Sequence, residues 1–207
     1  MKLKKKIKVI LIIVIVLAII AGAGFVTYKV INKKPVVKET KVLKTIDEYG
    51  YELKDNKSKQ YKELFKELEK ILLEDKVDEE AYVKKIAELF IYDFYTLSDK
   101  TAKTDVGGVD FVQSSALANF LINAEDTYYK YVESNLYGER KQALPTVNTV
   151  SIESITPTEF VYNNQKAAAY EVKLSWTYTE DKYSDYQNAA RLVFVKEDIK
   201  YYLVELQ

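Results

Sequence analysis

The sequence contains no cysteine and no histidine among its 207 residues. Without cysteine the chain has no disulfide, no thiol nucleophile and no thiolate metal ligand. Without histidine it lacks the side chain that titrates near neutral pH and the commonest metal ligand. Serine-histidine-aspartate and cysteine-histidine catalysis are both excluded, and zinc and iron sites would need ligands that the chain lacks. We therefore expect a protein that is not an enzyme and that binds no metal or cofactor.

Glycine and proline are also scarce, with six and three copies. Long flexible linkers are therefore few, and the 48% of hydrophobic residues are enough for a packed core. The pair Gly107-Gly108 lacks the spacing and the lysine of a phosphate-binding loop. Asp105 and Asp110 flank this pair, and we interpret the segment as a turn rather than a cation site.

Adjacent carboxylates are the remaining candidates for chemistry. A glycosidase needs two carboxyl groups about 5–10 Å apart across a sugar, one of them with a raised pKa. Neighbouring acids on a helix or strand usually point in different directions, so these pairs are interpreted as solvated surface. The pairs are Glu125-Asp126, Glu180-Asp181 and Glu197-Asp198.

The N-terminus combines a lysine cluster with a long uncharged segment. Residues 1–8 include five lysines, and residues 9–26 carry no charge. A helix of 18 residues is about 27 Å long, close to the hydrocarbon thickness of a bilayer. Tyr28 follows where interfacial aromatic residues are common. We predict a transmembrane helix over residues 9–28, with the lipid bilayer as its partner.

A cleaved signal peptide is the alternative, since Ala21-Gly22-Ala23 resembles a small-residue cleavage site. The apolar segment is longer than a usual signal core, which favours an uncleaved anchor. The lysines before it are denser than those after it, so residues 1–8 are placed in the cytoplasm. The expected location is the cell membrane, with a single pass and the C-terminal domain outside.

Charge divides the chain into two parts. Residues 1–44 hold 11 lysines and one acid, Glu39, so the remainder carries 20 basic and 30 acidic side chains. An acidic domain repels phosphate backbones, and we expect no nucleic-acid partner. The lysines near the anchor are interpreted as topology signals and as contacts with anionic lipid.

Helical periodicity follows a juxtamembrane connector expected over residues 29–58. Apolar residues recur at steps of three and four in three segments. Asp78 is a predicted N-cap for the second helix, and Gly138 is a predicted C′ residue that ends the third. Residues 109–112 between the last two helices are predicted as a short strand. The apolar stripes are Tyr61, Leu64, Phe65, Leu68, Ile71 and Leu72; Tyr82, Ile86, Leu89, Phe90, Phe94 and Leu97; and Leu117, Phe120, Leu121, Ala124, Tyr128, Tyr131, Val132 and Leu136.

After Pro145 the period changes to two, as in β-strands. Residues 168–178 alternate apolar and polar side chains, which indicates a long strand with one buried face. In residues 190–195 apolar side chains occupy both odd and even positions, which indicates a more central strand with two buried faces. Residues 197–200 are predicted as a hairpin loop. Helices followed by an antiparallel sheet define an α+β fold. We expect about three helices on a curved antiparallel meander of four or five strands, in an extracytoplasmic domain over residues 59–207.

This order of elements resembles the nuclear transport factor 2-like, or cystatin-like, α+β fold. Residues 192–206 resemble the last two strands of that superfamily, including an aromatic residue after the turn lysine, as Tyr201 follows Lys200. A membrane anchor before such a domain is similar in layout to Gram-positive conjugation and type IV secretion envelope components. The resemblance implies an assembly protein without catalytic residues.

Aromatic residues supply the candidate site. Cone-shaped folds of the resembling type often leave a pocket between helices and sheet, where tyrosines hold an apolar or glycan ligand. The alternatives are a protein interface, where tyrosine is enriched, and a tyrosine-rich core. The candidates for the pocket or interface are Tyr92, Phe94, Tyr95, Tyr128, Tyr131, Trp176, Tyr178 and Tyr202.

Two hypotheses for function follow. The first is a membrane-anchored, extracytoplasmic scaffold or protein-interaction module of the cell envelope, with an envelope protein as its partner. The second is a small-ligand-binding domain that uses a pocket between helices and sheet. The sequence leaves the oligomeric state open under both.

Overall fold

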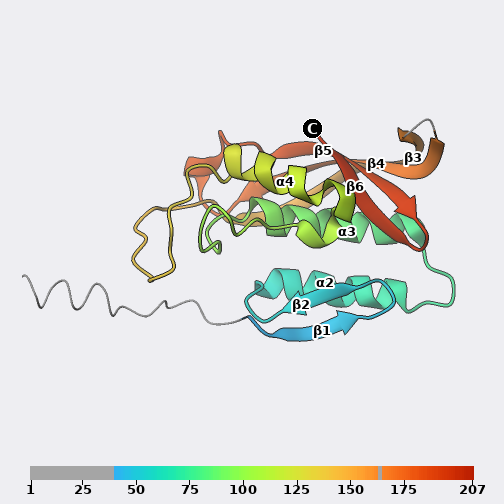
Figure 1. Ribbon diagram of the computed structural model, residues 1–207, viewed down its shortest axis with the longest axis horizontal. Coiled ribbons are helices and arrows are strands. Elements are labelled where there is room, and N and C mark those ends of the chain that lie inside the picture. Colours follow the sequence, from blue (N-terminus) through green and yellow to red (C-terminus); the bar gives the residue numbers. More distant parts are fainter. Residues whose placement is uncertain (1–39, 163–164) are drawn as a thin grey trace, which may run out of the picture.

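The computed structural model describes residues 40–162 and 165–207. The predicted cytoplasmic tail and transmembrane helix, over residues 1–28, lie outside this range. Within the described range, no helix has the length and apolar character needed to cross a membrane. The described chain is an α+β protein with three α-helices, a four-stranded antiparallel sheet and a separate two-stranded sheet (Figure 1).

The elements follow one another in an order that places both strands of the small sheet first. They are β1 (Val42–Ile46), β2 (Tyr51–Lys54), α2 (Lys59–Leu72), α3 (Glu79–Tyr95), η1 (Val109–Phe111), α4 (Ser114–Asp126), β3 (Val147–Tyr162), β4 (Gln165–Tyr178), η2 (Asp181–Tyr183), β5 (Ala189–Glu197) and β6 (Lys200–Leu206). The β1–β2 hairpin belongs to the folded body, because Ile46, Tyr51 and Leu53 join the hydrophobic core. The segment expected as a connector over residues 29–58 therefore ends in a core-forming hairpin.

Both α2 and α3 begin where side-chain caps are available. The Ser58 hydroxyl accepts a hydrogen bond from the Tyr61 N–H group, and the Asp78 carboxylate accepts one from Ala81. Each cap satisfies an amide that lacks a partner in the first turn of a helix. The predicted N-cap at Asp78 is confirmed.

Helix α3 is buried on all of its faces and forms the middle layer of the fold. Besides the predicted stripe it buries side chains on the other faces, including Val83, Ala87 and Ile91. A helix that is apolar all round must be covered on every side. Figure 1 shows α3 between the four-stranded sheet and a layer made of α2 and the β1–β2 hairpin. The expectation that all three helices pack on the sheet is therefore wrong for α2, which packs on α3.

The large sheet is a meander with the strand order β3-β4-β5-β6. On β4, Val172, Leu174 and Trp176 are buried as the alternation predicts. On β5, Leu192, Val193 and Phe194 are buried on both parities, which confirms its interior position. The edge strand β3 carries two register shifts and Pro157, features that oppose pairing with another strand. The other edge of the sheet is β6.

Helix α4 is shorter than predicted. It ends at Asp126, because Thr127 leaves helical geometry with φ −118° and ψ −90° and donates its hydroxyl to the Asn123 carbonyl at 2.6 Å. The Tyr129 N–H group then bonds to the Ala124 carbonyl, and Tyr129 turns into the core with no exposed surface. The predicted continuation to Leu136, with Gly138 as its C′ residue, is wrong.

The segment before α4 also differs from its prediction. Residues 109–112 were expected as a strand, yet Val109–Phe111 is a 3₁₀ helix. Gly108 precedes it with φ 76°, a conformation that glycine adopts without strain. Only Val112 makes a strand-like contact, an isolated parallel bridge to Leu203 of β6. This bridge places the start of α4 beside the edge of the large sheet.

Candidate functional site

Two hollows of the described structure lie along α4. One has a volume of about 620 Å³ and lies between α4, the end of α3 and the last residues of β6. The other has a volume of about 540 Å³ and lies between the start of α4, β6 and the far end of the β3–β4 hairpin. Ala116, Asn119 and Val204 border both. We call the two hollows together the α4 trough.

The trough exists because the inner side of α4 carries small and amide side chains. Ala116, Asn119, Phe120 and Asn123 line the first hollow at helical spacings of three and four. Ala124 is the only residue of α4 that is fully buried. Phe120 packs on Phe90 and Phe94, and the small and amide side chains beside it do not fill the space next to the strand. The space is open to an added side chain or a ligand.

The two ends of α4 are fixed at neighbouring residues of one loop. Before the helix, the Gly108 N–H group donates to the Asp93 carboxylate at 2.9 Å. After the helix, the buried Tyr129 hydroxyl accepts from the Gly107 N–H group at 3.0 Å and donates to the Phe94 carbonyl at 2.6 Å. Both ends of the helix that forms this wall of the trough are thus held at the end of α3 and the loop after it.

The Tyr129 hydroxyl is therefore expected to contribute strongly to stability. Tyr129→Phe leaves a buried N–H group and a buried carbonyl without partners, at a cost of about 1–3 kcal/mol. Urea unfolding of the full chain in detergent measures this cost. The matched control is Tyr131→Phe, since Tyr131 is 76% exposed and should change stability by less than about 0.5 kcal/mol. Equal effects of the two variants would contradict the anchoring role.

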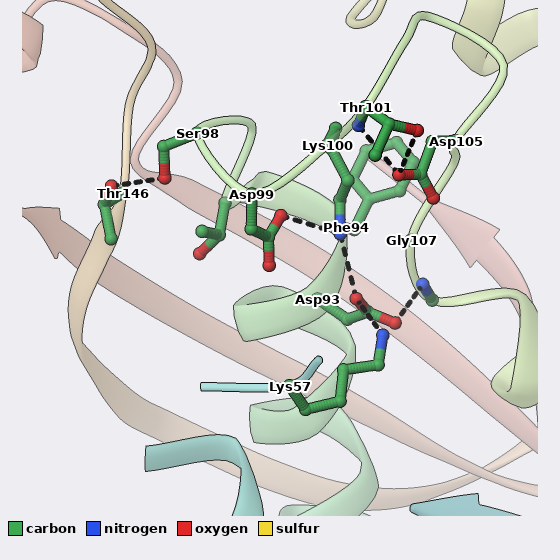
Figure 2. Close-up of polar contacts among 12 residues, drawn as sticks. Lys57, Asp93, Phe94, Ser98, Asp99, Lys100, Thr101, Asp105, Gly107 and Thr146 are labelled. Atoms are coloured by element: carbon green, nitrogen blue, oxygen red, sulfur yellow. Dashed lines mark hydrogen bonds and ion pairs between the residues drawn. The ribbon is translucent and has the colours of Figure 1, made fainter. Parts of the chain in front are cut away.

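Asp93 forms the buried ionic centre beneath this loop. Figure 2 shows Lys57 and Lys100 converging on its carboxylate, with Nζ–Oδ1 distances of 2.6 and 3.0 Å. Burial alone raises the pKa of Asp93, but the Lys100 and Lys57 charges and the Gly108 N–H group hold that pKa far below its usual range. Asp93 therefore stays ionised, and its oxygens are occupied by these donors. Such a carboxylate serves structure rather than proton transfer.

Further hydrogen bonds fix the loop between α3 and η1. The Asp105 carboxylate accepts from the Thr101 N–H and hydroxyl groups at 2.8 and 3.0 Å. The Arg140 guanidinium donates to the Lys100 and Ser98 carbonyls at 2.7 and 2.8 Å. These contacts hold Lys100 against Asp93 and close the loop over the centre.

Asp110 lies near the same centre and is held less favourably. Burial raises its pKa and the Asp93 charge adds to this, while Lys54, Lys57 and Lys200 act in the opposite direction. Because the raised pKa is the net result, the folded state favours the protonated form of Asp110 more than the unfolded state does. At neutral pH the charge on Asp110 therefore opposes folding.

We expect Asp110→Asn to stabilise the protein at pH 7, because asparagine keeps the shape without the charge. The raised pKa sets how stability changes with pH. As the pH falls through the folded pKa of Asp110, the charge is neutralised and the wild type gains stability. The variant has no carboxylate at this position and lacks this gain. Urea midpoints of both proteins between pH 7 and pH 4 provide the measurement. A variant less stable than the wild type at pH 7 would contradict the assignment.

The structure brings four of the eight predicted site residues to the trough. Phe94, Tyr95 and Tyr128 line its first hollow, and Tyr202 lines the second. Trp176 lies behind Tyr95, with ring centroids 4.3 Å apart.

The other three predicted residues lie away from the lining. Tyr178 is buried and donates its hydroxyl to the Gln187 carbonyl. Tyr92 is buried elsewhere and donates to the Asn148 carbonyl. Tyr131 is exposed beside Lys130, whose ammonium lies 5.4 Å from the ring centroid. Helical continuation to Leu136 would have placed Tyr131 on the same face as Tyr128, and the end of α4 at Asp126 removes that relation.

Asp93, the edge of β6 and three lining residues of α4 are absent from the candidates that the sequence predicts; the three are Ala116, Asn119 and Asn123. A signal for Asp93 existed, because it is a single acid inside the apolar run IYDFY of a buried helix. An acid there requires a buried partner. The inner residues of α4 gave no such signal, since alanine and asparagine are ordinary on helix surfaces.

The described residues contain no cluster of three or more acids that would suit a metal ion. Asp105 bonds to Thr101, as described above. The comparisons give no further guide: no family model, no curated protein and no solved structure matches the chain.

Proposed function

We propose that the chain is a non-catalytic, membrane-anchored interaction module of the cell envelope that binds a partner protein at the α4 trough. The observation that carries this proposal is the trough itself. It is a long hollow with apolar and amide walls, beside a helix whose two ends are hydrogen-bonded to the end of α3 and to the loop after it. A surface of this kind suits binding rather than chemistry.

The charges around the trough support a binding role. Lys166 pairs with Glu159 and Lys196 pairs with Glu79. Glu205 pairs with Arg191 at 3.0 Å. Ionisable groups that are already paired do not provide a poised acid and base. The trough therefore selects its occupant mainly by shape and by neutral polar contacts.

The N-terminal segment supplies the location in this proposal. Residues 9–28 anchor the chain in the membrane, residues 1–8 lie in the cytoplasm, and the acidic body lies outside. The proposal includes the resemblance to nuclear transport factor 2-like domains of conjugation and type IV secretion components. Its support is the order of helices followed by an antiparallel meander.

Filling the trough tests the proposal. Ala116→Trp in the full chain places an indole in the hollow, and Lys66→Trp on the exposed side of α2 is the control. The chain is crosslinked in living cells, and the membrane proteins that become joined to each variant are then quantified. We expect a defined envelope protein to be lost with Ala116→Trp and retained with Lys66→Trp. A chain that is recovered only as monomer, or free in the medium after cleavage near Ala23, would contradict the proposal.

A small apolar ligand is the second candidate for the same site. The volume of the first hollow lies within the range of ligand pockets, and Phe94, Tyr95 and Tyr128 give it aromatic walls. Mass spectrometry of the protein purified without denaturation would detect a ligand. This candidate requires a compound that the wild type carries and Ala116→Trp does not.

A further inference from the structure

We infer that the occupant of the α4 trough is an extended, uncharged segment of a partner protein, which adds as a further strand to the edge of β6 over residues 204–207, after the bridge of Leu203 to Val112. This inference rests on the proposed function and specifies how the partner is recognised. It follows from the backbone of β6, from the walls of the trough and from its charges.

The outer edge of β6 faces the first hollow. All five residues from 203 to 207 line it. Successive side chains of a strand point to opposite faces of a sheet, so a hollow that touches five successive residues lies along the edge of the strand. Leu203 is bridged to Val112, so the free part of the edge covers residues 204–207 and is about 14 Å long at 3.4 Å per residue. This length matches a short strand better than a compact ligand.

The edge offers backbone groups that have no partner in the described structure. Arg191 and Gln207 exchange two backbone hydrogen bonds, of 2.8 and 3.0 Å. Antiparallel pairs alternate, so the next pair, Leu192 and Leu206, is not hydrogen-bonded to each other. The N–H and carbonyl groups of Leu206 therefore point away from β5, and no described residue bonds to them. An added strand would satisfy both groups.

A register shift next to Val193 leaves Val204 as an extra residue on β6. Bulges of this kind bend the strand and change the direction of its side chains. Val204 borders both hollows, so the bend lies where the two meet. The bridge of Val112 to Leu203 occupies the edge just before this bend, so the occupant pairs with the edge after it, beside the first hollow.

The opposite wall matches a polypeptide backbone. Asn119 and Asn123 line the first hollow from α4, and each side-chain amide can both donate and accept. Ala116 and Phe120 line the same hollow and offer apolar surface to side chains of the occupant. A strand placed here pairs with β6 on one side and meets these amides on the other.

The charges that line the trough indicate whether the occupant is charged. The charged side chains that line the trough already have partners, as Lys196 with Glu79 and Glu205 with Arg191 show. Glu197 accepts from the Gln113 amide at 3.0 Å. A charged occupant would find no unpaired countercharge and would lose hydration. The segment that fits is uncharged, with apolar residues at alternate positions.

Phage display provides the test. Peptides of about ten residues, the upper range of natural strands, are selected from a random library on the full chain in lipid nanodiscs. We expect uncharged peptides with apolar residues at alternate positions. N-methylation of alternate backbone amides should weaken binding about fivefold or more for each lost hydrogen bond. Hydrogen exchange should show protection of the Leu206 amide when the peptide binds.

A pair of variants separates backbone pairing from side-chain contact. Leu206→Pro removes the outward N–H group and the side chain, whereas Leu206→Ala removes the side chain alone. We expect about fivefold or greater weakening by proline beyond that by alanine. If the proline variant does not fold, the N-methylated peptides on the wild type decide the question.

The remaining outcomes overturn the inference. Selected peptides that Ala116→Trp blocks but N-methylation leaves unaffected would mean side-chain binding in the trough, and the proposed function would stand. Failure to select any peptide would exclude strand addition. The proposed function would still be tested separately, by crosslinking the Ala116→Trp chain. Dimers of the chain that Leu206→Pro dissociates would identify a second copy as the occupant.

Discussion

Asp93→Asn is expected to destabilise the folded chain by about 3–5 kcal/mol, the usual cost of removing one partner from a buried ion pair. Asp93 is 5% exposed, and its carboxylate meets two ammonium groups and the Gly108 N–H group. An asparagine at this position leaves the Lys100 charge buried without its main countercharge. Since whole domains are stable by about 5–15 kcal/mol, this is a large share. Urea unfolding of the full chain in detergent measures the change.

The control for this variant is an exposed ion pair. Lys59 and Glu63 lie four residues apart on α2 with an N–O distance of 3.7 Å, and the lysine side chain is 91% exposed. Glu63→Gln should change stability by about 0.5 kcal/mol or less. A similar small effect of Asp93→Asn would show that the buried centre does not hold the fold.

Acid titration gives an independent check on Asp93. A carboxylate whose folded pKa is depressed contributes stability that is complete above its unfolded pKa, about 4, and is lost as the pH falls further. The wild type should therefore lose stability below about pH 4 more steeply than Asp93→Asn. Parallel profiles for the two proteins would contradict the depressed pKa.

Gly107→Ala is expected to destabilise the chain by about 3 kcal/mol or more, at the upper end of the cost of overpacking. A Cβ atom at this position would lie 2.1 Å from the Asp93 carbonyl oxygen, which is backbone and cannot move aside. The loop must shift, and with it the Gly107 N–H group that binds Tyr129 and the neighbouring amide that binds Asp93. Thermal or urea unfolding provides the measurement.

Gly50→Ala is the control, because it separates backbone strain from lack of space. Gly50 has φ 65° in the β1–β2 turn, and nothing lies within 4 Å of an added Cβ atom. Alanine there costs about 1–2 kcal/mol for the left-handed conformation alone. A cost at Gly107 no greater than that at Gly50 would mean that the loop is not closely packed on α3.

The parts of the fold that the sequence predicted are those set by local chemistry. The period of the stripes in α2 and α3, the cap at Asp78 and the two-sided apolar pattern of β5 each depend on residues close in sequence. The end of α4 depends instead on Tyr129, which leaves the helical period to reach Gly107 and Phe94. Those partners are distant in sequence, so periodicity alone extended the helix too far.

The candidate site was predicted in part for the same reason. Large aromatic residues are easily recognised as candidates in a sequence. Four of the predicted ones line the α4 trough, namely Phe94, Tyr95, Tyr128 and Tyr202. The rest of the site is defined by the small and amide side chains of α4 and by the unpaired part of the edge of β6. Such features arise only when elements far apart in sequence are placed side by side.

Photo-crosslinking at Asn119 tests the central claim most directly. A photoreactive amino acid at this position faces the trough, and one at Lys66 on α2 faces solvent on another layer. Irradiation of living cells that express the full chain should give one defined adduct with an envelope protein from position 119. Position 66 should give none. Equal adducts from both positions, or none from position 119, would contradict the account.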